Sequence, residues 1–141
     1  MLLINPKFNR SEKCTYYTKW VPMTLPISLA PLACHLNNQG KTAKIFDGNL
    51  YDLTRENLDK FLAALSLPYI FGISCVTANI NSGYETARVL KTMYPDAKVI
   101  MGGIHPTVLP AEVLNTGLVD IVVRGEGEET LLEIYDAMQE K

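Results

Sequence analysis

Two apolar stretches of this chain end in residues that could bind a ligand. Residues 69–77 read Tyr-Ile-Phe-Gly-Ile-Ser-Cys-Val-Thr, and residues 97–107 contain the pair Gly102 and Gly103. Parallel α/β sheets bind their ligands at the carboxyl ends of the strands. A hydroxyl such as that of Ser74 can hydrogen-bond a polar group, and glycine lets a bulky group approach the backbone. We therefore predict a binding site across these two strand ends, although the glycine pair also fits a tight turn.

The elements that would position this site alternate between strand and helix. Ser28 and Thr54 are placed to cap the first two helices, and leucines at helical spacing follow each of them. Parallel strands need crossover connections, which bury both faces of the sheet. We therefore predict an α/β fold with a five-stranded parallel sheet, doubly wound and flavodoxin-like, in the order 2-1-3-4-5. The predicted strands are residues 2–4, 44–47, 69–75, 98–101 and 120–124, and the later helices are 84–94, 110–115 and a last one containing 131–138.

Length and composition favour a single soluble domain. The chain has 141 residues, 48% of them hydrophobic, and a formal net charge of −2, so it lacks the basic surface that nucleic-acid binding needs. It has no apolar run of eighteen residues, so we expect no membrane span. Met1 leads directly into Leu-Leu-Ile-Asn without a secretion signal, and we expect a cytoplasmic protein.

The three cysteines indicate neither a disulfide framework nor a metal site. Cys14, Cys34 and Cys75 have neither the even count of a disulfide framework nor the spacing of a zinc or iron-sulfur motif, so we expect small reduced thiols.

Residues 7–25 form a long segment rich in aromatic residues. Such a segment either covers a site, faces a partner or is disordered.

The chain lacks the sequence motifs that bind the ligands most common in this fold class. A dinucleotide site needs glycines after the first strand, but this chain has Asn-Pro-Lys-Phe at positions 5–8, which leaves Asp47 as a turn residue. A phosphate-gripping loop is missing for the same reason. A phosphoacceptor domain would carry an aspartate where Ser74 and Cys75 end the third strand, and the hydroxyls after the first strand are too scattered for FMN.

Taken together, five motifs resemble the N-terminal cobalamin-binding domain of B12-dependent radical S-adenosylmethionine enzymes. They occur in the expected order and cover nearly the whole chain. They are residues 24–33, 43–49, 71–79, 96–107 and 120–130. The resemblance implies that a corrinoid ring lies across the carboxyl edge of the sheet and that its nucleotide tail descends beside strands three and four.

The resemblance also implies which residues contact the cofactor. Ser74, Val76 and Thr77 would line the tail and the ring, while Gly102 and Gly103 would leave room for the tail.

The loop before the last helix also resembles the corresponding loop of these cobalamin-binding domains. The resemblance therefore implies that Gly125 and Glu126 bind the cofactor. The alternative for Glu126, Glu128 and Glu129 is a purely structural role at a helix N-terminus.

Two motifs of related proteins are missing, and their absence limits the expected function. The chain lacks the Asp-x-His-x-x-Gly sequence that supplies a cobalt ligand in methyltransferases and mutases, so any cobalamin should be base-off. His105 is expected to hydrogen-bond within its loop, and His35, near a helix C-terminus, to be solvated or to face the helix dipole. The chain also lacks Cys-x-x-x-Cys-x-x-Cys, so S-adenosylmethionine and a [4Fe-4S] cluster would belong to a downstream domain.

Residues 1–141 are therefore expected to form one domain of a longer enzyme, with no catalysis of their own. The last helix shows no stop signal before Lys141, and the downstream radical domain would be the main partner. The parent enzyme would be a methyltransferase or a cyclase-like enzyme. The alternative is a flavodoxin-like interaction domain without a cofactor, which predicts that the ends of strands three and four are packed shut.

Overall fold

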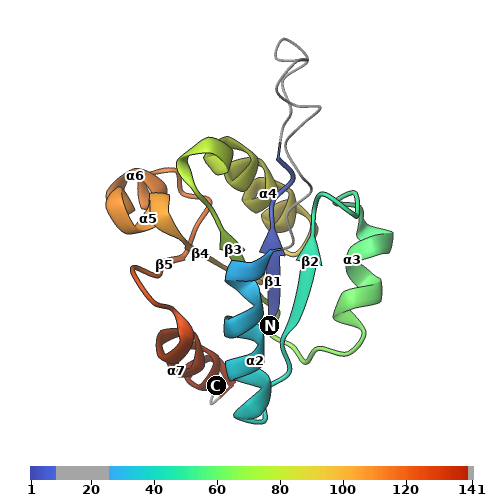
Figure 1. Cartoon of the computed structure of the whole chain (residues 1–141). Helices are drawn as coiled ribbons and strands as arrows, with labels where there is room; N and C mark the ends of the chain where they lie inside the picture. The colour runs from blue at the N-terminus through green and yellow to red at the C-terminus, as the bar shows by residue number, and fades with distance from the viewer. Residues whose placement is uncertain (9–25, 140–141) are drawn as a thin grey trace.

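A parallel five-stranded sheet forms the centre of the computed structural model, which describes residues 1–8 and 26–139 (Figure 1). All four strand pairings are parallel, and the spatial order is β2-β1-β3-β4-β5. The predicted order is therefore confirmed. The strands are β1 (Leu2–Asn5), β2 (Lys44–Asp47), β3 (Ile70–Ser74), β4 (Lys98–Gly102) and β5 (Ile121–Val122).

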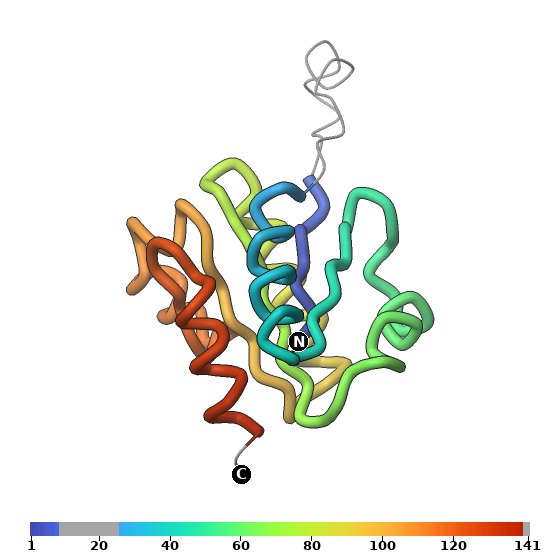
Figure 2. The backbone as a smooth tube through the Cα atoms, turned by 60° about the horizontal axis from the view of Figure 1, so that its bottom comes forward, coloured from blue at the N-terminus to red at the C-terminus, as the bar shows by residue number. Residues whose placement is uncertain are grey.

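Helices cover both faces of the sheet. Figures 1 and 2 show α2 and α7 side by side on one face, and the residues of α3 and α4 pack against the other. The helical elements are η2 (Ile27–Leu29), α2 (Ala30–Asn38), α3 (Arg55–Leu62), η3 (Thr77–Asn79), α4 (Ile80–Met93), α5 (Ile104–Val108), α6 (Pro110–Asn115) and α7 (Glu128–Gln139). None of these helices is long and apolar enough to cross a membrane.

Alternating side chains divide the core into two clusters, one on each face. Leu2 and Ile4 of β1 point into the cluster formed with α3 and α4, whereas Leu3 points into the cluster formed with α2 and α7. Both faces of the strands are buried, as expected for parallel sheets with crossover helices.

Local sequence signals explain most of the element boundaries. Thr54 caps α3 as predicted, because its side chain accepts a hydrogen bond from the backbone N–H of Asn57 at 3.3 Å. Asp47 is the last residue of β2 and starts the predicted turn: its backbone oxygen accepts from Leu50, and its carboxylate accepts hydrogen bonds from Asn5 and from Asn49 at 3.0 Å.

The structure departs most from the prediction in three places. The segment after Gly103 forms a short helix, α5, instead of an open connection, and α4 starts at Ile80 because η3 leads directly into it. The fifth strand is only Ile121–Val122, since its ladder with β4 covers only the partners Ile100 and Met101. The predicted roles of residues 9–25 lie outside the described residues.

Candidate functional site

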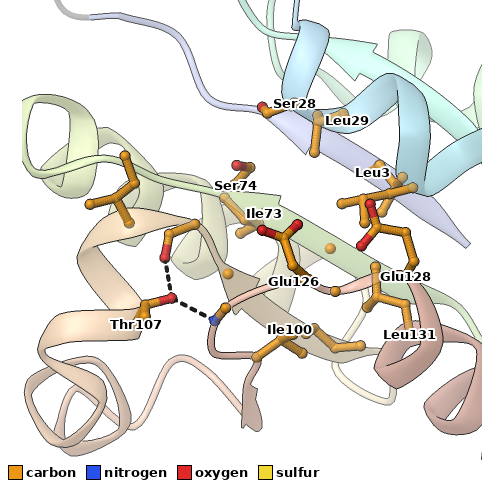
Figure 3. A pocket seen from close by; sticks show the side chains of 18 of the residues that line it. Leu3, Ser28, Leu29, Ile73, Ser74, Ile100, Thr107, Glu126, Glu128 and Leu131 are labelled. Carbon is orange, nitrogen blue, oxygen red and sulfur yellow. Dashed lines mark hydrogen bonds between the residues drawn. The ribbon is translucent and has the colours of Figure 1, made fainter.

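A cavity of about 440 Å³ opens at the carboxyl ends of the central strands (Figure 3). It lies on the sheet face that α2 and α7 cover, and residues from β1, β3 and β4 line its floor. This volume is within the range of small-molecule sites, about 300 to 1,000 Å³. The predicted site therefore coincides with a real hollow, and its strand ends are not packed shut.

The floor of the cavity is open at Gly102 of β4, whereas the Leu3 side chain packs over Gly72 of β3. Alternation places Gly72 and Ser74 of β3 on the same face, next to Ile100 and Gly102 of β4. Ser74 and Gly102 are direct partners across the two strands. The Ser74 hydroxyl has no hydrogen-bond partner among the described residues, so it remains available to a ligand. Gly72 was not predicted, although a glycine inside a strand can mark a close approach.

The two glycines at the end of β4 have different roles. A Cβ atom on Gly102 would lie 3.5 Å from the backbone oxygen of Val123, an ordinary contact. Gly103 has φ near +100°, and its Cβ would lie 2.4 Å from the backbone oxygen of Cys75. Gly103 therefore lets the ends of β3 and β4 approach each other, while Gly102 leaves the cavity floor bare.

Thr107 joins the two loops beside the cavity. Its hydroxyl donates to the backbone oxygen of Gly103 at 2.8 Å and accepts from the backbone N–H of Gly125 at 3.0 Å (Figure 3). The Nε–H of Arg124 donates to the backbone oxygen of Thr107 at 3.2 Å. Thr107 thus holds the loop before α7 in place. In the sequence, only the closeness of Thr107 to the pair Gly102 and Gly103 could have indicated this role.

The walls are mainly apolar. Leu29 and Leu32 come from η2 and α2, and Leu131 comes from α7. Ile104 and Val108 of α5 also line the cavity although their side chains are 68% and 69% exposed. Exposed apolar side chains beside an apolar cavity are typical of a binding site.

Ser28 also lines the cavity, and its predicted capping role is wrong. The chain enters α2 through the 3₁₀ turn η2, so the N-cap of α2 is Leu29, and no side chain caps either element. The Ser28 hydroxyl therefore provides a polar group on the wall opposite Ser74.

Two carboxylates are the only charged groups among the described lining residues. Glu126 precedes α7 and Glu128 is its first residue, and Figure 3 shows both carboxylates turned into the space that the lining residues enclose. Neither forms a salt bridge within the described residues. Glu129 instead lies 3.4 Å from the Nε2 atom of His35, outside the cavity.

Val76 and Thr77 lie beside the cavity and do not line it. Val76 is 40% exposed just after β3, on the carboxyl edge of the sheet. The Thr77 hydroxyl lies 3.2 Å from Nδ1 of His105. Of the seven predicted residues, the structure brings five together around the cavity, namely Ser74, Gly102, Gly103, Gly125 and Glu126.

His105 has both ring nitrogens engaged within the protein. The residue is 5% exposed, and its Nε2 lies 3.3 Å from Oε1 of Glu112, which also accepts a hydrogen bond from Tyr84 at 3.0 Å. Burial and this carboxylate raise the pKa of Tyr84 to about 12, so its hydroxyl stays a donor. The Nε2 atom of His105 faces Glu112 and its Nδ1 atom faces Thr77. His105 therefore forms hydrogen bonds, but it lies in α5 and its partners come from η3 and α6 instead of from its own loop.

Cysteine or metal chemistry has no support at this site. Burial raises the pKa of the Cys75 thiol to about 12, which makes it a poor nucleophile, and Cys34 is exposed elsewhere on α2. In the part of the chain that the structure describes, no three His, Cys, Asp or Glu side chains are grouped to hold a metal ion.

Known proteins with a similar sequence are methyltransferases and a cyclase. An uncharacterized methyltransferase of Pyrococcus horikoshii is 35% identical over 114 residues, which cover 80% of this chain and 24% of the relative. The anaerobic magnesium-protoporphyrin IX monomethyl ester cyclase of Rubrivivax gelatinosus is 32% identical over 82% of this chain and 21% of the relative. The chain therefore spans less than a quarter of the length of these relatives.

A solved structure has the same fold. The radical S-adenosylmethionine methyltransferase TsrM from Kitasatospora setae, determined with cobalamin and a [4Fe-4S] cluster bound, aligns with a TM-score of 0.76. The alignment covers 99% of this chain and 26% of that one, at 21% sequence identity.

The family model described as the B12 binding domain matches residues 24–135. This range contains every residue that lines the cavity except Leu3. The chain belongs to the B12-binding domain family.

Proposed function

We propose that this chain binds cobalamin in the cavity above β3 and β4 and holds it for a catalytic domain of a longer enzyme. The observation that carries the proposal is the open cavity itself, whose floor lacks a side chain at Gly102. A planar heterocycle such as the lower base of cobalamin needs such a bare, apolar slot. The family membership indicates the same cofactor.

The lining residues fit this group in chemistry as well as in size. Apolar walls from Leu29, Leu32 and Leu131 suit an aromatic base, and the hydroxyls of Ser28 and Ser74 can hydrogen-bond its polar linker. Burying the apolar faces of the base would contribute about 25 cal/mol for each Å² removed from water.

The edge of the sheet would contact the corrin ring. We propose that Val76, exposed beside the cavity, packs against the ring, as do Ile104 and Val108. Gly125 and Glu126 would lie close to the tail, because Thr107 holds their loop beside it. Thr77 would act indirectly, through its hydrogen bond to His105.

The bound cofactor would be base-off. The described residues that line the cavity include no histidine, and both nitrogens of His105 are engaged by Thr77 and Glu112. A base held in the cavity could not also coordinate cobalt above the sheet edge. The cobalt chemistry would come from the cofactor, and this chain would bind and orient it.

The parent enzyme would supply the remaining cofactors. Because the relatives are more than four times longer than the part matched, we propose a downstream domain that binds S-adenosylmethionine and a [4Fe-4S] cluster. A methyltransferase or a cyclase-like reaction fits their names. We also propose that this enzyme is cytoplasmic, where free thiols such as those of Cys34 and Cys75 stay reduced.

Retention of hydroxocobalamin tests this function. The chain is mixed with hydroxocobalamin at micromolar concentration and desalted, and the visible spectrum of the protein fraction is recorded. Gly102→Leu should lower retention at least tenfold, because its Cβ fits against Val123 and the rest of the side chain enters the cavity. Gly102→Ala should have a much smaller effect.

Ala111→Leu is the control, since it places the same leucine side chain on the exposed surface of α6 away from the cavity. A circular dichroism melt of each variant shows whether it folds. If the native chain retains no cobalamin, or if a folded Gly102→Leu variant retains as much as the native chain, the proposed function is wrong.

The alternative of an interaction domain without a cofactor has less support. It predicts that the ends of β3 and β4 are packed shut, whereas the cavity lies open over both. No observation on the described residues favours it.

A further inference from the structure

We infer that His105 is a positioning residue for the corrinoid: its side chain anchors α5, so that Ile104 and Val108 stay in place to pack against the corrin ring. This inference rests on the proposed function, which puts the ring beside these two side chains. His105 does not line the cavity, so it would act through α5 and not by touching the cofactor.

The short helix α5 turns its apolar side chains outward. Ile104 and Val108 are four residues apart, so they lie on the same face of the helix, and they are 68% and 69% exposed. The buried residues of α5 are His105 and Pro106. A surface helix usually buries its apolar face and leaves its polar residues in water. The reverse arrangement in α5 leaves the apolar face free for a ligand, and a polar side chain supplies much of the attachment.

His105 connects α5 to the elements around it. Its backbone N–H donates to the backbone oxygen of Cys75, which follows β3, at 3.3 Å. Its Nδ1 atom lies 3.2 Å from Oγ1 of Thr77 in η3, and its Nε2 atom lies 3.3 Å from Oε1 of Glu112 in α6. The same Glu112 oxygen accepts a hydrogen bond from Tyr84 of α4 at 3.0 Å. Because hydrogen bonds are directional, such a network specifies one position of α5.

Loss of the imidazole should disturb this position more than it destabilises the fold. The groups that face its two nitrogens are near solvent, since Thr77 is exposed and the Glu112 side chain is 50% exposed. Without the imidazole, both groups can hydrogen-bond water, so neither is buried without a partner. Leucine fills a similar volume but forms neither hydrogen bond. His105→Leu therefore separates the positioning role from a contribution to stability.

Amide hydrogen exchange of the cofactor-free chain tests the anchor directly. The backbone N–H groups of Thr107 and Leu109 donate to the backbone oxygens of Gly103 and His105, so they exchange when α5 opens. In His105→Leu they should exchange about tenfold faster than in the native chain, while the amides of α4 keep their native rates. The melting temperature should fall by less than about 5 °C. Unchanged exchange in α5 would overturn the inference.

Binding of hydroxocobalamin tests the link between the anchor and the cofactor. The dissociation constant, measured by spectral titration, should rise about tenfold in His105→Leu, because Ile104 and Val108 no longer keep one position before the ligand binds. His105→Gln should bind within about threefold of the native chain, since the glutamine amide offers both a donor and an acceptor. If His105→Gln binds as weakly as His105→Leu, hydrogen bonding by His105 is not what positions α5.

A double-mutant cycle shows whether His105 acts through α5. Ile104→Ala should weaken binding about fivefold in the native chain, because apolar contact with the ring is lost, and less than about twofold in His105→Leu. Leu114→Ala is the matched control, since it removes as many carbon atoms from an exposed side chain of α6 outside the cavity. It should leave binding unchanged in both backgrounds. Additive effects of His105→Leu and Ile104→Ala would overturn the inference.

The proposed function and the positioning role fail in different ways. If the native chain does not bind hydroxocobalamin, the proposed function is wrong, and the positioning role is overturned with it. If the native chain binds but a folded His105→Leu variant binds as tightly, the positioning role alone is overturned. Glu112→Ala is the second variant if His105→Leu folds poorly. It removes one partner of the imidazole from the exposed surface of α6, and it should raise both the exchange rate of α5 and the dissociation constant about threefold.

Discussion

Replacing the second glycine of the pair should damage the fold much more than replacing the first. An alanine at Gly103 must adopt φ near +100° and ψ near −173°, a region that costs about 1 to 3 kcal/mol for a residue with a side chain. Its Cβ would also lie 2.4 Å from the backbone oxygen and 2.9 Å from the backbone nitrogen of Cys75. Backbone atoms cannot rotate away, so the overlap should add about 1 to 3 kcal/mol.

Two other glycines separate these contributions. Gly40 has φ of +74°, and no atom lies within 4 Å of the place that a Cβ would occupy, so Gly40→Ala should cost only the conformational strain, about 1 to 2 kcal/mol. Gly102→Ala introduces an ordinary contact without a positive φ and should change the stability by less than about 0.5 kcal/mol.

Urea unfolding followed by circular dichroism measures all three variants. We expect the free energy of unfolding to fall by about 4 kcal/mol for Gly103→Ala, which can leave a small domain largely unfolded. If the Gly103→Ala protein is as stable as the Gly40→Ala protein, then Gly103 is not needed for the close approach of β3 and β4.

Two further predictions concern titratable side chains. Burial opposes ionisation of Asp120, but hydrogen bonds from Lys91 at 2.6 Å and from a β4 backbone amide at 2.7 Å outweigh it and lower its pKa. Asp120→Asn should therefore cost about 1 kcal/mol at pH 7, and this cost should disappear as the pH falls below the ordinary aspartate pKa of about 3.9. Urea unfolding between pH 3 and 7 checks this, and a cost that grows on acidification contradicts it. The second prediction concerns the two described cysteines in a Cys14→Ser variant. A thiol reagent at pH 8 should modify the exposed Cys34 at least tenfold faster than Cys75, because burial raises the pKa of the Cys75 thiol to about 12. Equal modification rates for Cys34 and Cys75 would contradict this prediction.

The amino-acid sequence contains enough information to predict the fold and the edge of the sheet at which the cavity opens. Apolar runs and helical spacings are local patterns, and one handedness of crossover then allows few arrangements of five parallel strands. Ser74 and Gly102 each end a strand, so parallel pairing brings them to the same edge. These parts of the prediction depend on rules that hold for any sequence of this type.

The missed residues depend on three-dimensional relations that a local pattern does not contain. Gly72 lies inside a strand, and its role comes from the Leu3 side chain of the neighbouring strand, which packs over it. Ser28 resembles a helix cap in sequence, but the preceding 3₁₀ turn moves it onto the cavity wall. Thr107 forms its contacts with two loops that are distant from each other in sequence.

The division of the core between the two faces of the sheet has a consequence for how such a domain can change over evolution. The cluster under α3 and α4 is packed without the ligand, whereas the cluster between α2 and α7 borders the cavity. Substitutions that reshape the cavity therefore leave the other half of the core intact. One side of the sheet can maintain the folded state while the other adapts to a new ligand.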